Sequence, residues 1–133
     1  MKILSIILLL VITSLFVFFN GDKGVNSMSP INPSQREAAA LKAIKASYGN
    51  EESEYSTTLF ATHHIEELES SYWEKHLGVQ TPMPQQVLEI LKLQSAWDDN
   101  QVFDFTLPDD VTSYVISVRF NEAGVVDDIS MEG

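Results

Sequence analysis

The chain contains no cysteine and few basic residues, and these two absences already restrict its function. Without cysteine there is no disulfide framework, no Cys-ligated zinc site and no lipid-modified N-terminal cysteine. Eight Lys and Arg stand against 19 Asp and Glu, so the net charge is −11, and the basic surface that nucleic-acid binding requires is missing. The sequence also lacks a Gly-rich phosphate loop, a Gly-x-Ser-x-Gly elbow and a His-Glu-x-x-His motif. We therefore expect no catalytic residue, no cofactor, no metal site and no nucleic-acid partner.

The first residues of the chain form a separate hydrophobic segment. Residues 3–19 carry no charge, and a helix of these 17 residues would be about 26 Å long. The hydrocarbon core of a bilayer is ~30 Å thick, and local thinning accommodates the difference. The segment is apolar on all sides, whereas a core helix of a globular domain would carry a polar stripe. We expect residues 1–20 to be a signal anchor or a signal peptide.

The length of the segment favours the anchor. A signal peptide has an apolar region of ~7–15 residues followed by a small-residue cleavage site, whereas this run is longer and ends in bulky residues at 16–19. Cleavage after Val25-Asn26-Ser27 stays open as the alternative. Lys2 and the α-amino group place the N-terminus in the cytoplasm. The expected location is the inner (cytoplasmic) membrane, single pass, with the C-terminal domain outside the cytoplasm; the alternative is a secreted or periplasmic protein after cleavage.

The remainder divides into a linker and one domain. Residues 21–33 are rich in Gly, Asn, Ser and Pro, which predicts a flexible linker. Residues 34–133 have the length of a single domain. Without Lys2, Lys23 and Asp22, 6 basic and 18 acidic residues remain, so this domain carries a charge of −12.

Capping patterns predict three helices in the domain. Ser34-x-x-Glu37 has the form of a capping box and starts a helix over 35–48, which Gly49 ends. Ser71-x-x-Glu74 starts a short helix that Gly78 closes. A third helix begins around Pro82–Pro84, because proline is tolerated in a first turn. Its apolar face is formed by Val87, Leu88, Ile90, Leu91 and Leu93.

Alternation and β-branched residues predict strands over 55–65, 102–107, 114–120 and 125–131. Asn121 to Gly124 supplies a hairpin turn. A plain four-residue loop would pair Phe120 with Val125, whereas a glycine bulge would place Arg119 opposite Asp127. We favour the bulge, because it keeps Asp127 off the apolar face. The predicted fold is α+β: a small antiparallel sheet of three to four strands, with a C-terminal hairpin, packed against two to three helices and preceded by the N-terminal hydrophobic helix.

Four segments carry a resemblance to a known family: Tyr72–Gly78, Phe103–Pro108, Tyr114–Phe120 and Asp127–Glu132. Together they resemble a bacterial family of small acidic domains of unknown function. Some similar proteins act as immunity partners of toxins that bacteria exchange. The resemblance covers most of residues 34–133 and none of the first thirty, and it implies no catalytic residues.

Large aromatic residues and paired aspartates are the candidates for partner binding. Trp73, Trp97, Tyr72 and Tyr114 are large enough to anchor an interface if one of them is exposed within an acidic rim, although aromatic residues are more often core. Asp109-Asp110 and Asp127-Asp128 lack the spacing of a calcium loop and are expected at a turn and a strand edge. The candidate partner-binding residues are Trp73, Tyr72, Asp109, Asp110, Asp127 and Asp128.

Two functions from different classes remain open. The first is a membrane-tethered or exported acidic domain that binds a basic protein, most concretely an immunity protein that occludes a toxin. The second is an envelope enzyme or a small-ligand or metal-binding protein that uses His63, His64 or the aspartate clusters. Neighbouring residues on the expected strand point to opposite faces, so His63 and His64 are not expected to share an ion.

Overall fold

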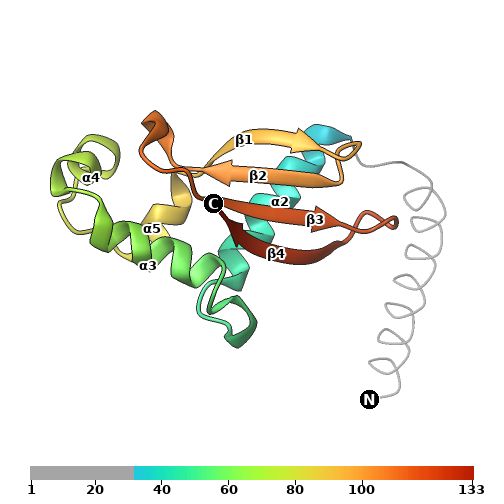
Figure 1. The fold of residues 1–133 in the computed structure, drawn as a ribbon, viewed down its shortest axis with the longest axis horizontal. Helices are drawn as coiled ribbons and strands as arrows, with labels where there is room; N and C mark the ends of the chain where they lie inside the picture. The colour runs from blue at the N-terminus through green and yellow to red at the C-terminus, as the bar shows by residue number, and fades with distance from the viewer. Residues whose placement is uncertain (1–31) are drawn as a thin grey trace, which may run out of the picture. The chain divides into compact units, whose positions relative to one another are not determined.

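The structure is a computed structural model that describes residues 32–133. The hydrophobic segment and nearly all of the predicted linker lie outside the described residues. The described part runs through helices α2 (Pro33–Ser47), η1 (Glu51–Ser53), α3 (Thr57–Glu67), α4 (Ser70–Leu77) and α5 (Pro84–Glu89), and then through β1 (Lys92–Trp97), β2 (Val102–Thr106), η2 (Pro108–Asp110), β3 (Val115–Phe120) and β4 (Val126–Glu132). Figure 1 shows the helices preceding the sheet along the chain.

The predicted α+β class with an antiparallel sheet is confirmed. The four strands follow one another in the order β1-β2-β3-β4, so each strand pairs with its neighbour in the chain. Helix α2 lies behind the sheet in Figure 1. Strand β2 pairs with β3 in a register that sets Phe103 opposite Val118 and Phe105 opposite Ile116.

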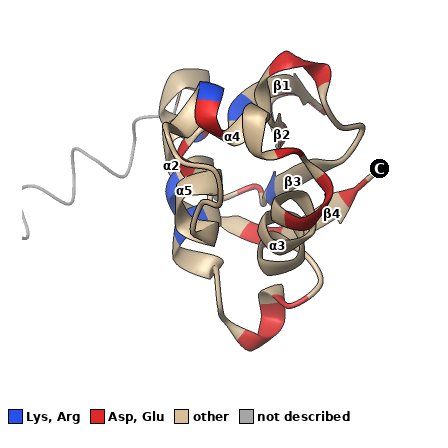
Figure 2. Cartoon of the chain, turned by 90° about the vertical axis from the view of Figure 1, so that its left-hand side faces the viewer, with Lys and Arg blue, Asp and Glu red and all other residues tan. Residues whose placement is uncertain are grey.

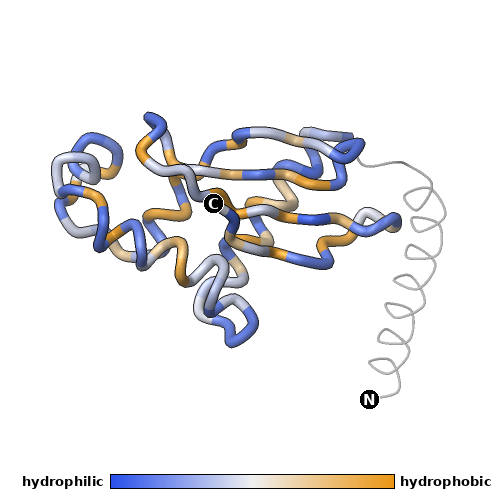
Figure 3. The backbone as a smooth tube through the Cα atoms, in the orientation of Figure 1, coloured by the Kyte–Doolittle hydropathy of each residue, from blue (hydrophilic) through white to orange (hydrophobic). Residues whose placement is uncertain are grey.

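One face of the sheet packs on the helices and forms the core. The alternation of hydrophobic and hydrophilic residues along the strands is visible in Figure 3. All four α-helices contribute buried side chains to the same cluster. Its members are Ala40, Ile44, Phe60, Ala61, Trp73, Val87, Leu88, Leu91, Phe103, Phe105, Leu107, Ile116, Val118 and Phe120. Burial of apolar area on this scale is the main source of stability in a domain of this size.

The sequence predicts the C-terminal ends of the helices better than their N-terminal ends. Gly49 and Gly78 both have positive φ, at 84° and 73°, as expected of residues that end helices. The cap of α2 is Asn32, whose side chain accepts from the Gln35 N–H at 2.8 Å, so the predicted Ser34 cap is wrong by two residues. Proline at position 33 fits the first helical position. The predicted capping box at Ser71 is also absent, since α4 begins at Ser70.

The prediction of a strand over 55–65 is wrong, because this segment is helix α3. Its buried residues recur at helical spacing: Thr57, Phe60, Ala61 and His64. Packing of this face against the core outweighs the β preference of its threonines, since tertiary contacts routinely override local propensity. Helix α3 therefore adds one helix to the three that were expected.

The apolar face predicted for the third helix extends too far, because it includes Leu93. Helix α5 ends at Glu89, and Leu93 belongs to β1 instead. Strand β1 is an edge strand, and apart from the half-buried Leu93 its residues are exposed, so it has no clear alternation of apolar and polar residues. A register shift between Leu93 and Ser95 interrupts its pairing with β2, as edge strands often show.

The C-terminal hairpin has a register that neither alternative described. Phe120 pairs with Val126, and Arg119 pairs with Asp128, with an irregularity between the two pairs. Asp127 is the extra residue of this bulge. The favoured pairing of Arg119 with Asp127 is therefore wrong by one residue, although the presence of a bulge is confirmed. The bulge keeps Asp127 off the apolar face, because it is exposed.

Candidate functional site

Within residues 32–133, no helix covers the outer face of the sheet (Figure 1), and this face carries the polar residues of the strands. The register aligns one row of residues across the four strands: Trp97, Val102, Arg119 and Asp128. A second row across the sheet consists of Ser95, Asp104, Ser117 and Ser130. Together these rows surround a depression of about 460 Å³, which we call the outer-face depression; it is lined by Trp97, Asp104, Ser117, Arg119, Asp128, Ser130 and Glu132.

Trp97 is the aromatic anchor of this face. Its indole Nε1 donates a hydrogen bond to Asp104 Oδ2 at 3.0 Å, and the Ser95 hydroxyl donates to the same oxygen at 3.4 Å. The side chain is held at one edge while the residue stays 49% exposed. A tryptophan that is fixed in this way presents a large contact surface at low entropic cost.

Asp104 lies at the floor of the depression. Its second oxygen, Oδ1, is buried and has no hydrogen-bond partner among the described residues. A buried carboxylate oxygen without a donor is costly, because hydrogen bonds to charged groups are among the stronger ones. Because this oxygen is buried, it is closed to a donor on another molecule, and the exposed acceptors of the depression are the carboxylates of Asp128 and Glu132.

Arg119 closes the side of the depression that faces the β1–β2 loop. Its Nη1 donates to Asp98 Oδ2 at 3.2 Å, and its guanidinium carbon lies 6.0 Å from the centre of a Trp97 ring. This distance is at the limit of a cation–π contact. The favoured bulge predicts Arg119 opposite Asp127, whereas Arg119 lies opposite Asp128 and forms its ion pair with Asp98.

The loop that carries Asp98 has an unusual backbone. Asp98, Asp99 and Asn100 have φ of 57°, 53° and 62°, so three consecutive non-glycine residues are left-handed. Asp and Asn tolerate this conformation better than other residues. The Asn100 carbonyl accepts a hydrogen bond from Arg36 Nη1 at 2.9 Å, which ties the loop to α2. The loop therefore places Asp98 where its carboxylate pairs with Arg119.

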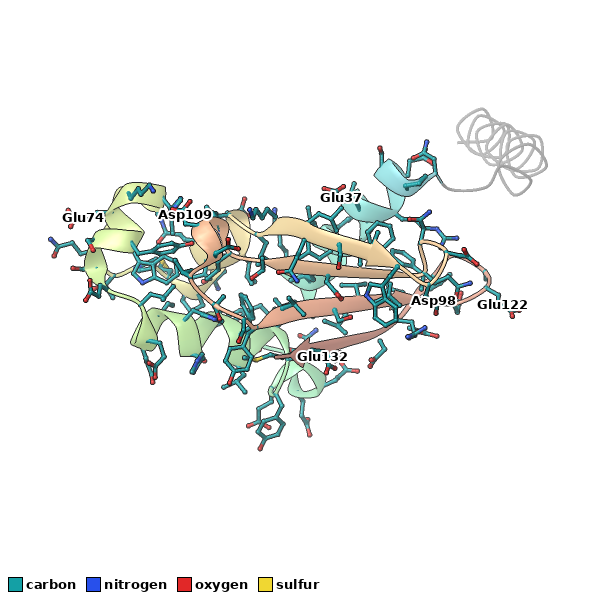
Figure 4. The ribbon with its side chains drawn as sticks, turned by 45° about the horizontal axis from the view of Figure 1, so that its top comes forward. Glu37, Glu74, Asp98, Asp109, Glu122 and Glu132 are labelled. Carbon is teal, nitrogen blue, oxygen red and sulfur yellow. The ribbon has the colours of Figure 1, made fainter. Side chains whose placement is uncertain are left out.

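The predicted partner-binding residues fall into two groups at opposite ends of the sheet. Asp109 and Asp110 lie in η2, after β2 and before β3. Asp127 and Asp128 lie at the start of β4, beside the hairpin turn. In Figure 4, Asp109 is close to Glu74 on α4, whereas Asp98 and Glu122 lie at the other end of the sheet. Only Asp128 belongs to the outer-face depression, and the sequence did not link it with Trp97.

Trp73 is not a surface residue, which corrects its assignment as a partner-binding residue. It is 1% exposed and belongs to the core cluster. Tyr72 beside it is half-buried, and its hydroxyl donates to the Pro108 carbonyl at 2.9 Å. Burial, and then the charge of Asp109, raises the pKa of Tyr72 to about 12. Tyr72 therefore ties α4 to η2, whereas Trp73 holds α4 in the core.

Asp109 is held by two side chains of α4. Its Oδ2 is 2.8 Å from Lys75 Nζ and 2.8 Å from His76 Nε2. Hydrogen bonds from Lys75 and then from His76 hold the pKa of Asp109 below its usual value. Asp110 is exposed. Because Asp109 is already paired, it offers less unmatched charge to a partner than the carboxylates beside Trp97.

His63 and His64 lie on helix α3, so the strand argument that separated them does not apply. His64 is 1% exposed, and its Nδ1 donates to the Phe60 carbonyl at 2.7 Å. Its Nε2 accepts from the Thr112 hydroxyl at 2.8 Å. Burial lowers the pKa of His64. His63 packs edge-on against Tyr114, with ring centres 5.4 Å apart, and residues 32–133 contain no group of three or more His, Asp or Glu side chains placed to hold a metal ion.

Comparison with known proteins returned no matching family model, no similar curated protein and no similar solved structure. Within residues 32–133, no helix combines the length and the apolar character that crossing a bilayer requires. The function is therefore inferred from the geometry and the charge of the domain.

Proposed function

We propose that this chain is an acidic protein-binding domain, tethered to the membrane or exported, that covers a basic surface of a partner protein. In its most concrete form it is an immunity protein that neutralises a bacterial toxin by occlusion. The observation that carries the proposal is Trp97, which is half-exposed and fixed by Asp104 among carboxylates of the outer face. An exposed, rigid tryptophan within a charged rim has the composition of a binding hot spot.

The distribution of charge supports a basic partner. Three of the six basic residues of the domain, Arg36, Lys42 and Lys45, lie on α2, which is behind the sheet. Most of the blue segments in Figure 2 gather around α2 and α5, and red segments are spread over the other elements. The outer-face depression contains three carboxylates and one cation, Arg119. A charge of −12 would steer a basic partner to the domain and raise the rate of association.

Binding would proceed by exchange of ion pairs at the outer face. A lysine or arginine of the partner would reach the exposed carboxylates of Asp128 and Glu132 and compete with Arg119 for Asp98. Such exposed pairs contribute little energy each, about 0.2–1 kcal/mol. Burial of the Trp97 ring would supply the larger part of the affinity, at about 2 kcal/mol for a hot-spot residue. No residue of this chain needs to be catalytic in this mechanism.

The location follows from the hydrophobic segment. Residues 3–19 would hold the domain at the inner membrane, with residues 34–133 outside the cytoplasm, or would direct its export if they are cleaved. An incoming toxin would then meet the domain before it damages the envelope. A reporter fused after Gly133 tests this orientation, and a cytoplasmic signal would contradict it.

The proposal is tested with Trp97→Ala and a matched aromatic control. Tyr55 is 78% exposed and lies on the α3 side of the domain, so Tyr55→Ala removes an exposed aromatic outside the outer face. The tagged full chain and both variants are compared for capture of partners from envelope extract, and captured proteins are identified and purified. We expect Trp97→Ala to weaken binding of a basic partner at least tenfold, and Tyr55→Ala to leave it unchanged.

Salt and a competition assay complete the test. The association rate should fall as ionic strength rises, because the attraction is screened over ~10 Å at 0.1 M salt. A strain that lacks this chain should lose to its parent in co-culture with toxin-producing cells. Normal survival of that strain, together with equal capture by wild type and Trp97→Ala, would count against the proposal.

A further inference from the structure

A second cavity lies between η1 and the start of β4, and it is separate from the function proposed above. It has a volume of about 330 Å³, at the lower end of the range for small-molecule sites. We call it the η1–β4 pocket; it is lined by Ser47, Asn50, Glu52, Ser53, Ser56, Val126, Asp127, Asp128 and Ile129. It shares only Asp128 with the outer-face depression.

Ser56 is the unusual residue of this pocket. It occupies the N-cap position of α3, where a serine hydroxyl ordinarily accepts a hydrogen bond from the first turn. Its backbone has φ −122° and ψ −102°, and its side chain makes no capping bond. Ser56 is 6% exposed, and its hydroxyl is buried without a partner among the described residues. A buried hydroxyl in this state costs free energy unless a ligand satisfies it.

The other polar groups of the pocket already have partners inside the domain. The Ser47 hydroxyl donates to the Ile44 carbonyl at 2.7 Å. The Ser53 hydroxyl donates to the Asn50 carbonyl at 3.0 Å, and the Asn50 side-chain amide donates to the Ala46 carbonyl at 3.4 Å. Among the hydroxyl and amide groups of the lining, the Ser56 hydroxyl is therefore the one without a partner within residues 32–133, and Glu52, Asp127 and Asp128 are exposed.

The residues that line the pocket determine which chemical class of ligand it can bind. Glu52, Asp127 and Asp128 make the pocket negative, which disfavours an anion. These residues are not placed to hold a metal ion within residues 32–133, and Ca²⁺ needs six to eight oxygens at ~2.3–2.6 Å. A primary ammonium is less demanding, because it has three donors and tolerates longer distances. Val126 and Ile129 offer an apolar wall for the alkyl stem.

We propose that the η1–β4 pocket binds a primary alkylammonium group, with the Ser56 hydroxyl and the carboxylates of Glu52 and Asp127 as its recognition groups. Two sources share this chemistry: a small free amine and the side chain of a lysine in a protein. The proposal does not depend on Trp97, so its failure and the failure of the partner-binding function are distinguishable.

The test is a titration of the ¹⁵N-labelled full chain, in a nonionic detergent, followed by amide chemical shifts. The probes are n-butylammonium chloride for a free amine and Nα-acetyl-lysine N-methylamide for a lysine residue. Tetramethylammonium chloride at equal ionic strength is the control, because it has the charge but no N–H donor. We expect both amines to produce saturable shifts at residues 50–56 and 126–129, and tetramethylammonium to produce none.

Substitutions test whether the amines bind in the η1–β4 pocket. Ser56→Ala and Glu52→Gln should each raise the dissociation constant of butylammonium about two- to five-fold. Glu54→Gln is the matched control, because Glu54 is two residues away and does not line the pocket. Ser56→Ala should unfold at the same temperature as wild type or higher, since its hydroxyl makes no bond in the protein.

The source follows from the ratio of the two dissociation constants. Tighter binding of the lysine amide indicates a protein ligand, and equal or tighter binding of butylammonium indicates a free amine. Three results would overturn the proposal. No saturable shift at residues 50–56 would mean that the pocket holds water only, equal shifts with tetramethylammonium would mean that charge alone is sensed, and equal affinity of wild type and Ser56→Ala would mean that the Ser56 hydroxyl does not recognise the ammonium.

Discussion

Replacing Thr112 by valine should weaken the domain by a defined amount, because Thr112 holds the buried His64. The Thr112 hydroxyl donates to His64 Nε2 at 2.8 Å and accepts from the Tyr114 N–H at 3.1 Å. Valine has nearly the same shape but makes neither bond. Tyr114 is exposed, so water replaces its acceptor, whereas Nε2 stays buried without a donor.

The magnitude follows from the unsatisfied nitrogen. Leaving one buried acceptor without a partner costs about 1–3 kcal/mol, so Thr112→Val should lower the free energy of unfolding by about 2 kcal/mol. For a domain of this size, that loss lowers the melting temperature by about 10 °C. Thr112→Ser keeps the hydroxyl and should recover most of the loss. Urea and thermal unfolding at pH 7.5, followed by circular dichroism, measure both variants.

The same geometry fixes the tautomer of His64. A carbonyl can only accept, so Nδ1 must carry the proton that bonds to Phe60, and Nε2 must be the acceptor. Nitrogen chemical shifts of the imidazole report this directly. A tautomer protonated at Nε2, or a loss in Thr112→Ser as large as that in Thr112→Val, would refute the reasoning.

Three further predictions concern pH and backbone conformation. Burial lowers the pKa of His64 below 6.5, so the unfolded chain takes up the proton first as pH falls. The contribution of His64 to stability is therefore complete above about pH 6.5 and is lost below it. Between pH 7.5 and 5.5, the free energy of unfolding in urea should depend less on pH for His64→Gln than for wild type. Tyr72 should ionise at about pH 12, and ultraviolet titration of Tyr72→Phe should lack this transition. Gly78→Ala should cost about 1–2 kcal/mol in urea unfolding, because φ is 73° and alanine is strained there even though no atom crowds its Cβ; an unchanged midpoint would contradict this.

The parts of the fold that were predictable are those where local pattern and burial coincide. Strand β3 alternates from Ile116 to Phe120 because one face packs on the helices, and the sequence shows this pattern. Gly49 and Gly78 end helices because a left-handed residue is needed there. Segment 55–65 was mistaken for a strand, since its threonines favour β structure while its buried residues follow a helical period that only the core reveals.

The candidate site was less accessible to sequence reasoning. Trp97 was named as a large aromatic, but strand β1 is exposed on an edge and shows no alternation that would identify it. The meeting of Trp97 with Arg119 depends on the exact register of three strands. The bulge at Asp127 moves Asp128, instead of Asp127, opposite Arg119, and one residue of shift decides which side chains meet. The sequence does not indicate that the Ser56 hydroxyl lacks a hydrogen-bond partner within residues 32–133, because a serine before a helix ordinarily caps it.

The order of the elements along the chain has a consequence for folding. All four strands lie between Lys92 and Glu132, whereas the helices that pack on them are complete by Glu89. During synthesis, which starts at the N-terminus, the apolar faces of the helices, with Phe60 and Trp73, therefore stay exposed until the last hairpin has been made. Neighbouring strands need only short loops to meet, so the sheet can then close quickly, but a truncation that removes β4 would leave β3 as an unprotected edge prone to aggregation.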